Sequence, residues 1–145
     1  MDRITMVITD ASVIGSVQGP GAWACYVNGR EFCGPLPVVM GNNVAELWAI
    51  NEGLLRCPGN TRVLLWCDNR MALMWANRTA GVDFYNPHKF LIYTTQQAIL
   101  STIEALNLDV KYQLVKGHKF NQDHNRIDRL AKREARLTAD DYYGR

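Results

Sequence analysis

A short, uninterrupted apolar run near the middle of the chain constrains the fold more than any other feature. Residues 63–67 read Val-Leu-Leu-Trp-Cys and offer no polar position for a solvent-facing side. Such a run is typical of a strand that is buried on both faces in a parallel sheet. A helical pattern before it, from Asn42 to the stop signal at Pro58-Gly59, and another after it provide crossovers between parallel strands. The run therefore predicts an α/β fold.

The remaining patterns complete the order β-β-β-α-β-α-α-β-α. Three alternating segments come first: one from Ile4 that ends at Asp10, one over residues 23–27, and one after the hairpin signal Asn28-Gly29 that runs toward Val38. After the apolar run come a short helix from about Asn69, a helix over 89–106, a strand over 110–114 and a closing helix over 125–136. We therefore predict a five-stranded mixed β-sheet flanked by α-helices, in a single domain over residues 1–145 with 137–145 as a tail.

Composition excludes several classes of protein. Of the 145 residues, 48% are hydrophobic, which is typical of a globular chain that buries a full core. There is no run of about eighteen apolar residues, so no membrane span is expected. The first residues pass directly into a strand pattern and leave no room for a signal peptide, so we expect a cytoplasmic protein, and a monomer.

Positive charge is concentrated toward the end of the chain. Residues 111–136 hold eight of the sixteen lysines and arginines and three acidic residues, although the net charge of the chain is only +2. Such a run either forms the solvated face of a helix or attracts a polyanion, and the pattern alone leaves both interpretations open. The basic residues are Lys111, Lys116, Lys119, Arg126, Arg129, Lys132, Arg133 and Arg136.

Two aspartates stand where α/β sheets collect functional side chains. Asp10 and Asp68 each come at the end of a predicted strand. In open α/β sheets the carboxyl ends of the strands surround the binding crevice. Neighbouring carboxylates repel each other unless one is protonated or both hold cations, and Mg²⁺ prefers such oxygen ligands. Two ions at such a site can activate a water and stabilise the leaving oxygen of a phosphodiester.

Two further carboxylates, Glu46 and Asp128, are candidates for the same site, but each of the four also has a purely structural interpretation. Asp10 could start a turn, and Asp68 could cap the helix that follows it. Glu46 could close a capping box at the start of its helix. Asp128 could pair with Lys132 on a helix surface. Spacing alone does not show that the four carboxylates converge.

Five sets of residues along the chain together resemble the motifs of the type 1 ribonuclease H family, between about Ile4 and Arg136. One such motif is weak, whereas five in the family's order on the expected elements are specific. The matching residues are Thr9-Asp10-Ala11-Ser12 for the family's T-D-G-S, Gly19-Pro20-Gly21-Ala22 for its G-P-G-G, Asn42-Asn43-Val44-Ala45-Glu46-Leu47 for its N-N-x-x-E-L, Cys67-Asp68-Asn69 for its T-D-S, and Val115-Lys116-Gly117-His118 with Ile127-Asp128-Arg129-Leu130-Ala131 for its V-K-G-H and x-D-x-L-A. The resemblance implies the ribonuclease-H-like fold and hydrolysis of the RNA strand of RNA–DNA hybrids.

The resemblance also implies roles for the matched residues. His118 would assist proton transfer or product release. Asn42 and Asn43 would contact the RNA strand near its 2′-hydroxyls, the groups that distinguish RNA from DNA. The ligands of two Mg²⁺ ions, with Mn²⁺ as an alternative, would be Asp10, Glu46, Asp68 and Asp128. The full set of substrate contacts would be Ser12, Asn42, Asn43, Arg70, Lys116, Lys119 and Arg126.

The chain departs from the family pattern at several positions. The family usually has Asn four residues before its last Asp, where this chain has His124. His124 could approach the metal site or cap the closing helix, and we favour the cap. Arg70 stands where the family often has Gln, and Ala11 replaces a Gly. No separate hybrid-binding domain is expected before Ile4, so hybrid affinity would depend on the basic region or on a partner protein.

Two other classes of function remain as alternatives. The first is a DNA-acting nuclease of the same fold, such as a resolvase, which would share the carboxylates but would not need the Asn42-Asn43 pair. The second is an inactive nucleic-acid-binding module, against which the presence of all four carboxylates argues.

Overall fold

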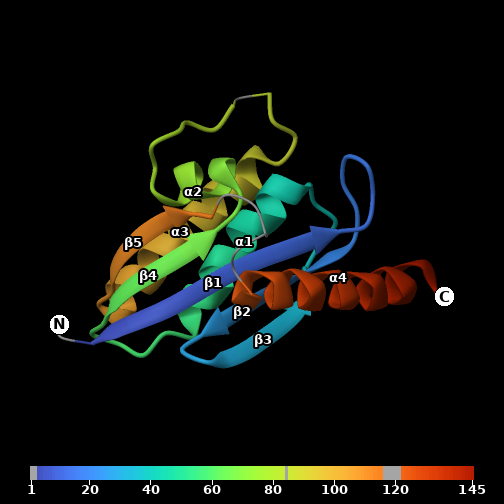
Figure 1. The fold of residues 1–145 in the computed structure, drawn as a ribbon. Coiled ribbons are helices and arrows are strands. Elements are labelled where there is room, and N and C mark those ends of the chain that lie inside the picture. The colour runs from blue at the N-terminus through green and yellow to red at the C-terminus, as the bar shows by residue number, and fades with distance from the viewer. Residues whose placement is uncertain (1–2, 84, 116–121) are drawn as a thin grey trace.

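The computed structural model describes residues 3–83, 85–115 and 122–145, and the structural statements below concern those residues. The elements follow the predicted order along the chain (Figure 1). They are β1 (Ile4–Val13), β2 (Gly21–Val27), β3 (Arg30–Pro35), α1 (Asn42–Leu55), β4 (Arg62–Cys67), α2 (Arg70–Ala76), α3 (Lys89–Leu106), β5 (Asp109–Leu114) and α4 (Gln122–Tyr143).

The five strands form one mixed sheet in the order β3-β2-β1-β4-β5. β1 pairs antiparallel with β2 and parallel with β4, and β4 pairs parallel with β5. The β2–β3 hairpin turns through Asn28 and Gly29, both with positive φ, as a two-residue hairpin turn requires. The prediction of a five-stranded mixed sheet flanked by helices is therefore confirmed.

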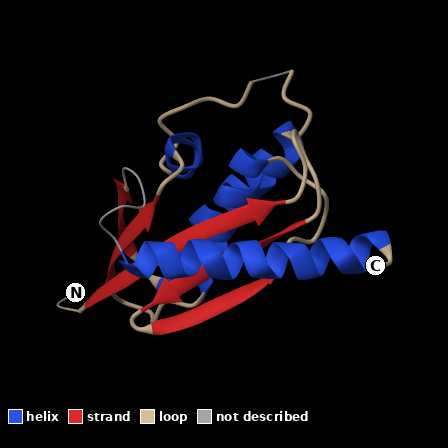
Figure 2. Ribbon diagram, turned by 45° about the vertical axis from the view of Figure 1, so that its right-hand side comes forward, coloured by secondary structure: helices blue, strands red, loops and turns tan. Residues whose placement is uncertain are grey.

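The helices lie on both faces of this sheet, as the two ribbon views show (Figures 1 and 2). α1, α2 and α3 cover one face and enclose the larger hydrophobic core. α4 crosses the other face over β1, β2 and β3. None of the described helices combines the length and the apolar character that a membrane span needs.

A glycine sets how closely α1 approaches β1. A Cβ atom on Gly53 would lie 2.8 Å from the Thr9 side chain and 3.0 Å from that of Val7, so only glycine fits this contact without displacing the strand. Glu46 lies two turns earlier on the same helix, and its side chain is buried. The close approach of α1 therefore brings the Glu46 carboxyl to the end of the sheet where Asp10 lies.

The ends of two strands differ from the predictions. β1 does not end at Asp10, because its pairing with β2 continues to Val13 opposite Gly21. Its parallel pairing with β4 does stop at Ile8, so Asp10 still lies just beyond the parallel ladder. β3 ends at Pro35 and does not continue toward Val38. The N–H of Leu36 still donates to the carbonyl of Gly21, but Pro37, which has no N–H to donate, follows it.

The closing helix is longer than predicted at both ends. α4 begins at Gln122 and ends at Tyr143, so residues 137–143 are helical and do not form a tail. The reason is a continuous buried face along the helix, whose C-terminal part consists of alanines that pack closely but add little hydropathy. Its buried residues are His124, Ile127, Ala131, Ala135 and Ala139.

Candidate active site

Four elements from distant parts of the sequence meet at a cleft of about 320 Å³ beyond the carboxyl ends of β1 and β4. The cleft contains all four predicted metal-binding carboxylates: Asp10 from β1, Glu46 from α1, Asp68 after β4, and Asp128 from α4. The other residues that line it are Ala11, Ser12, Val13, Asn42, Asn69 and Lys132. The convergence that spacing could not establish is therefore present in the structure.

Asp10 and Glu46 form the buried part of the cleft. Their exposed fractions are 2% and 3%, and the backbone N–H of Ala11 donates to both, at 2.9 Å to Asp10 Oδ1 and 3.3 Å to Glu46 Oε1. Burial, with the nearby charge of Asp68, raises the pKa of Asp10 to about 7. Burial and the charge of Asp10 raise the pKa of Glu46 well above its usual range.

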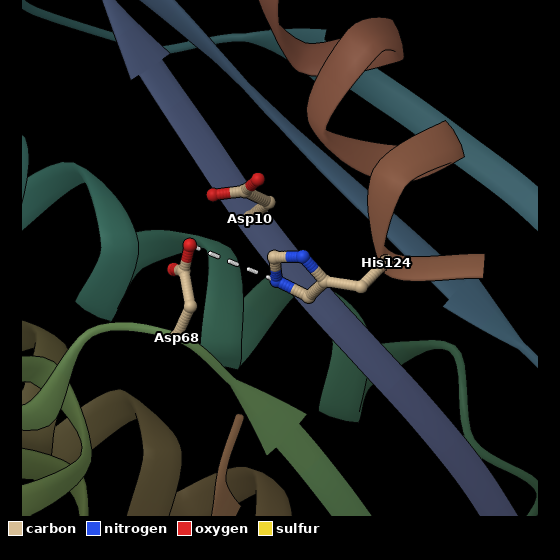
Figure 3. Close-up of side chains that lie close together, drawn as sticks. All are labelled: Asp10, Asp68 and His124. Carbon is tan, nitrogen blue, oxygen red and sulfur yellow. Dashed lines mark ion pairs between the residues drawn. The ribbon is translucent and has the colours of Figure 1, made fainter. Parts of the chain in front are cut away.

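Asp68 and Asp128 lie closer to solvent, each with a side chain 22% exposed. The Asp68 carboxylate faces His124, whose Nε2 lies 3.9 Å from Asp68 Oδ2 (Figure 3). Lys132 Nζ lies 3.0 Å from Asp128 Oδ2, one helical turn along α4. The ion pair between Asp128 and Lys132 that was considered as a purely structural role is therefore present, and it lies within the cleft.

The position of His124 differs from the prediction that it caps the closing helix. It lies within the first turn of α4, not at a cap position, and its side chain is fully buried. Figure 3 shows its imidazole directed from α4 toward Asp68, with Asp10 beside them on β1. One ligand atom from each of Asp10, Asp68 and His124 lies within 4.8 Å of the others. The cap interpretation of His124 is wrong, and the residue belongs to the cleft cluster.

The structure also lacks the purely structural roles considered for Asp68, Glu46 and Asp10. The N-cap of α2 is Asn69, whose Oδ1 accepts from the N–H of Ala72 at 2.9 Å, so Asp68 is not the cap. The N-cap of α1 is Gly41, with no side-chain cap bond, so Glu46 closes no capping box. Asp10 lies inside β1 and starts no turn.

The predicted substrate-binding residues are spread over several places. Ser12 and Asn42 line the cleft. Asn43 lies beside it, and its Oδ1 accepts from Asn69 Nδ2 at 2.8 Å. Arg70 is exposed and lines a separate cavity with Tyr112.

Arg126 on α4 forms ion pairs with Glu31 of β3 and with Asp123, so acidic partners already neutralise part of its charge. Lys116, His118 and Lys119 lie outside the described residues, and their roles stay predictions.

Cys67 contacts a residue of the cleft and was not among the predicted site residues. Cys67, the last residue of β4, places its Sγ 3.8 Å from Glu46 Oε2, and the N–H of Asn69 donates to Sγ at 3.5 Å. Burial raises the pKa of the Cys67 thiol to about 12, so it remains a neutral neighbour of Glu46. The only signal in the sequence was its position before Asp68, where the family that the chain resembles has Thr.

The donor set fits divalent cations. Four carboxylates surround one cleft, and Asp10 Oδ2 is buried with no hydrogen-bond partner among residues 3–83, 85–115 and 122–145. A buried carboxylate oxygen without a donor is costly unless it is protonated or bound to a cation. Oxygen donors of this kind suit hard ions such as Mg²⁺.

Comparisons with known proteins concern the family and the fold of the chain. The family model of RNase H matches residues 2–136. No curated protein matches the chain. Among solved structures, the chain is similar to the N-terminal RNase H domain of Rv2228c from Mycobacterium tuberculosis, with a TM-score of 0.74 and 18% identity over 97% of this chain and 99% of that one.

It is also similar to RNase H1 from the archaeon Halobacterium salinarum, with a TM-score of 0.71 and 16% identity over 90% of this chain and 96% of that one. LC9-RNase H1, described as a type 1 RNase H with the type 2 active-site motif, gives a TM-score of 0.72 and 17% identity over 94% and 74% of the two chains. At these identities the structural likeness concerns the fold.

Proposed function

The chain belongs to the RNase H family, and we propose that the cleft around Asp10, Glu46, Asp68 and Asp128 is where it acts. The protein hydrolyses the RNA strand of RNA–DNA hybrids, the activity of its family. One observation carries the assignment of the site: four carboxylates from four separate elements converge on a single cleft.

The four carboxylates would hold two Mg²⁺ ions, with Mn²⁺ as an alternative, and the bound ions would supply an activated water and a stabilised leaving oxygen. The protein's part is to fix the ligands. The Ala11 N–H orients Asp10 and Glu46, and the sheet and α1 hold both carboxyls away from solvent. Lys132 places a positive charge at the rim of the cleft, where it suits a phosphate of the substrate.

Recognition of the RNA strand is assigned to Asn42. Its side chain is exposed at the cleft, and an amide can both donate to and accept from a 2′-hydroxyl. A site built around such a bond rejects a substrate that lacks the hydroxyl, because its own polar groups are then left unpaired. The Asn43 amide is bonded to Asn69, so its contribution would be partly to hold this rim in place.

Asp10→Asn tests the site. It preserves the shape of the side chain and removes the charge that a cation needs, so hybrid cleavage should fall by about 100-fold or more while the fold persists. Asp109→Asn, the same change at the exposed start of β5, is the matched control and should leave cleavage unchanged. Cleavage is measured with saturating Mg²⁺ on labelled hybrid, double-stranded DNA, a four-way DNA junction and double-stranded RNA.

Wild-type turnover by Asp10→Asn would show that the site lies elsewhere. Equal cutting of all-DNA duplex and matched hybrid by the wild-type protein would replace the assignment with a DNA nuclease. Asn42→Ala should reduce hybrid cleavage much more than it reduces cation binding. It removes no helix cap, because the N-cap of α1 is Gly41. Sedimentation of the same samples tests the expectation of a monomer.

A further inference from the structure

We propose that His124 binds a divalent cation through Nε2, together with Asp10 and Asp68, and that this nitrogen ligand makes the centre favour Mn²⁺ over Mg²⁺. The inference rests on the proposed function, because it adds a ligand to the metal centre assigned above. It concerns a residue that is not part of the carboxylate set.

The distances fit a shared ion better than a direct bond. His124 Nε2 and Asp68 Oδ2 are 3.9 Å apart, whereas a charge-assisted hydrogen bond would bring them to about 2.7–2.9 Å. Two ligand atoms that are each about 2.1 Å from one ion lie between about 3.0 Å apart at a right angle and about 4.2 Å apart on opposite sides. The observed separation falls inside this range, and a ligand atom of Asp10 lies within 4.8 Å of both residues.

The burial of these side chains supplies an independent argument. The imidazole of His124 is fully buried and points toward Asp68 beside Asp10 (Figure 3). Asp10 Oδ2 is buried, and no hydrogen-bond donor reaches it from any described part of the chain. A cation placed among the three side chains would give this oxygen the positive partner that it lacks.

The helix that carries His124 also fixes its direction. His124 and Asp128 are four residues apart on α4, and residues at this spacing share one face of a helix. Asp128 lines the cleft, so the same face presents both side chains to the site. Ile127 and Ala131, buried against the sheet, hold that face in position.

A nitrogen ligand changes which ion the centre prefers. Mg²⁺ is a hard ion that favours oxygen ligands and keeps much of its water. Mn²⁺ accepts the same oxygen ligands, but it is a softer ion than Mg²⁺ and binds an added imidazole nitrogen more strongly than Mg²⁺ does. Replacing His124 by Asn, the residue usual in the family at this place, should therefore weaken Mn²⁺ binding by about tenfold or more. Mg²⁺ binding should change by less than about threefold, since its ligands are the carboxylates.

The three histidines of the chain allow a direct test. Electron spin echo envelope modulation (ESEEM) spectroscopy of Mn²⁺ bound to the protein detects an imidazole nitrogen that is coordinated to the ion. The double variant His88→Asn with His118→Asn leaves His124 as the sole histidine, so a surviving nitrogen signal must come from it. His124→Asn and His124→Gln should abolish the signal in the otherwise unchanged protein. Calorimetric titration with Mn²⁺ and with Mg²⁺ gives the two affinities, and circular dichroism checks folding.

The proposal is supported if the nitrogen signal survives in the double variant and disappears in the His124 variants. It is overturned if wild-type protein binds Mn²⁺ without a nitrogen signal, or if the signal disappears in the double variant. The double variant has His124 as its sole histidine, so its signal alone decides whether His124 binds the ion, even if the His124 variants fail to fold. A signal that persists in folded His124 variants also overturns the proposal. Hybrid cleavage measured on the same wild-type sample separates the two proposals: cleavage without a nitrogen signal removes this ligand and leaves the proposed function intact.

Discussion

The two faces of the sheet are covered in different ways. α1, α2 and α3 together cover one face, and large aliphatic side chains such as Ile50 and Ile99 fill the core beneath them. α4 alone covers the other face, where the fully buried cluster consists of Ile8, Ala24, Ile127 and Ala131. The free energy gained on burial scales with the apolar area removed from water, so α4 is held by less apolar burial than α1.

This difference divides the candidate site into two halves. Glu46 comes from α1 and is fixed by the larger core, whereas His124 and Asp128 come from α4. Asp10 belongs to the sheet between them, and Asp68 follows strand β4 of that sheet. We infer that the α1 half is rigid without a cation, and that the α4 half depends in part on a cation to complete its attachment. Four experiments test this comparison.

The largest expected effect is on stability. Ile50→Ala in α1 and Ile127→Ala in α4 remove the same atoms from fully buried positions, one on each face. We expect Ile50→Ala to lower the free energy of unfolding by about 4 kcal/mol, and Ile127→Ala by about 2–3 kcal/mol, because the smaller cluster can close more readily around the space left. Urea unfolding measures both. A larger loss for Ile127→Ala would reverse the comparison.

Sequence patterns located the elements well where the signal is local. The apolar run over 63–67, the Asn28-Gly29 turn and the helix over 89–106 are all present as predicted. Sequence patterns failed to give the ends of elements where those ends depend on contacts with a part of the chain that is distant in the sequence. β1 extends past Asp10 because β2 continues to pair with it, and the end of α4 is buried through Ala135 and Ala139, whose side chains carry little hydropathy signal.

The site shows the same limit. The four carboxylates could be named only through the family resemblance, because their structural interpretations fitted the local sequence equally well. The burial of His124 and the contact between Cys67 and Glu46 could not be predicted, since both follow from how α4 and α1 pack on the sheet. The roles of the predicted site residues stay predictions until the variants are measured.

The second experiment varies pH without added cations. The pKa of Asp10 is about 7 in the folded protein against 3.8 for the ordinary group, so the folded state binds the extra proton and is stabilised at low pH. This contribution is fully present below about pH 4 and is lost as the pH rises through 7. Relative to Asp10→Asn, the wild-type free energy of unfolding should therefore fall by an amount on the order of 3 kcal/mol between pH 4 and 7.

The measurement is thermal or urea unfolding in the presence of a chelator, with the difference between the two proteins taken at each pH. A parallel pH dependence in both proteins would show that the Asp10 carboxylate does not destabilise the folded protein as the pH rises.

The third experiment adds the cation. Binding at about 100 times the dissociation constant stabilises a folded protein by about 2.7 kcal/mol. Hydrogen exchange should show that α4 gains more protection than α1, because two of the proposed ligands lie on α4 and its apolar attachment is weaker. Asp10→Asn, measured at the same cation concentration, is the control. Equal gains in the two helices would contradict the proposed division of the site.

The smallest effect concerns Lys132, whose Nζ lies 3.0 Å from Asp128 Oδ2 at the edge of the cleft. Lys132→Gln removes a positive charge that competes with a cation for Asp128, so cation affinity should rise by about threefold. Stability without cations should change by less than about 1 kcal/mol, because the pair is partly exposed. Calorimetry measures the affinity, and a lower affinity in the variant would show that Lys132 supports the site.

The spread of the site along the chain has a consequence for the timing of activity during synthesis. Asp10, Glu46 and Asp68 are synthesised before His124 and Asp128, which belong to α4. At ordinary rates of about 5–20 residues per second, several seconds separate Asp68 from Asp128. While the chain is still being synthesised beside the messenger RNA, it therefore lacks the proposed ligands that α4 carries. The proposed set of ligands is complete only after α4 has been synthesised.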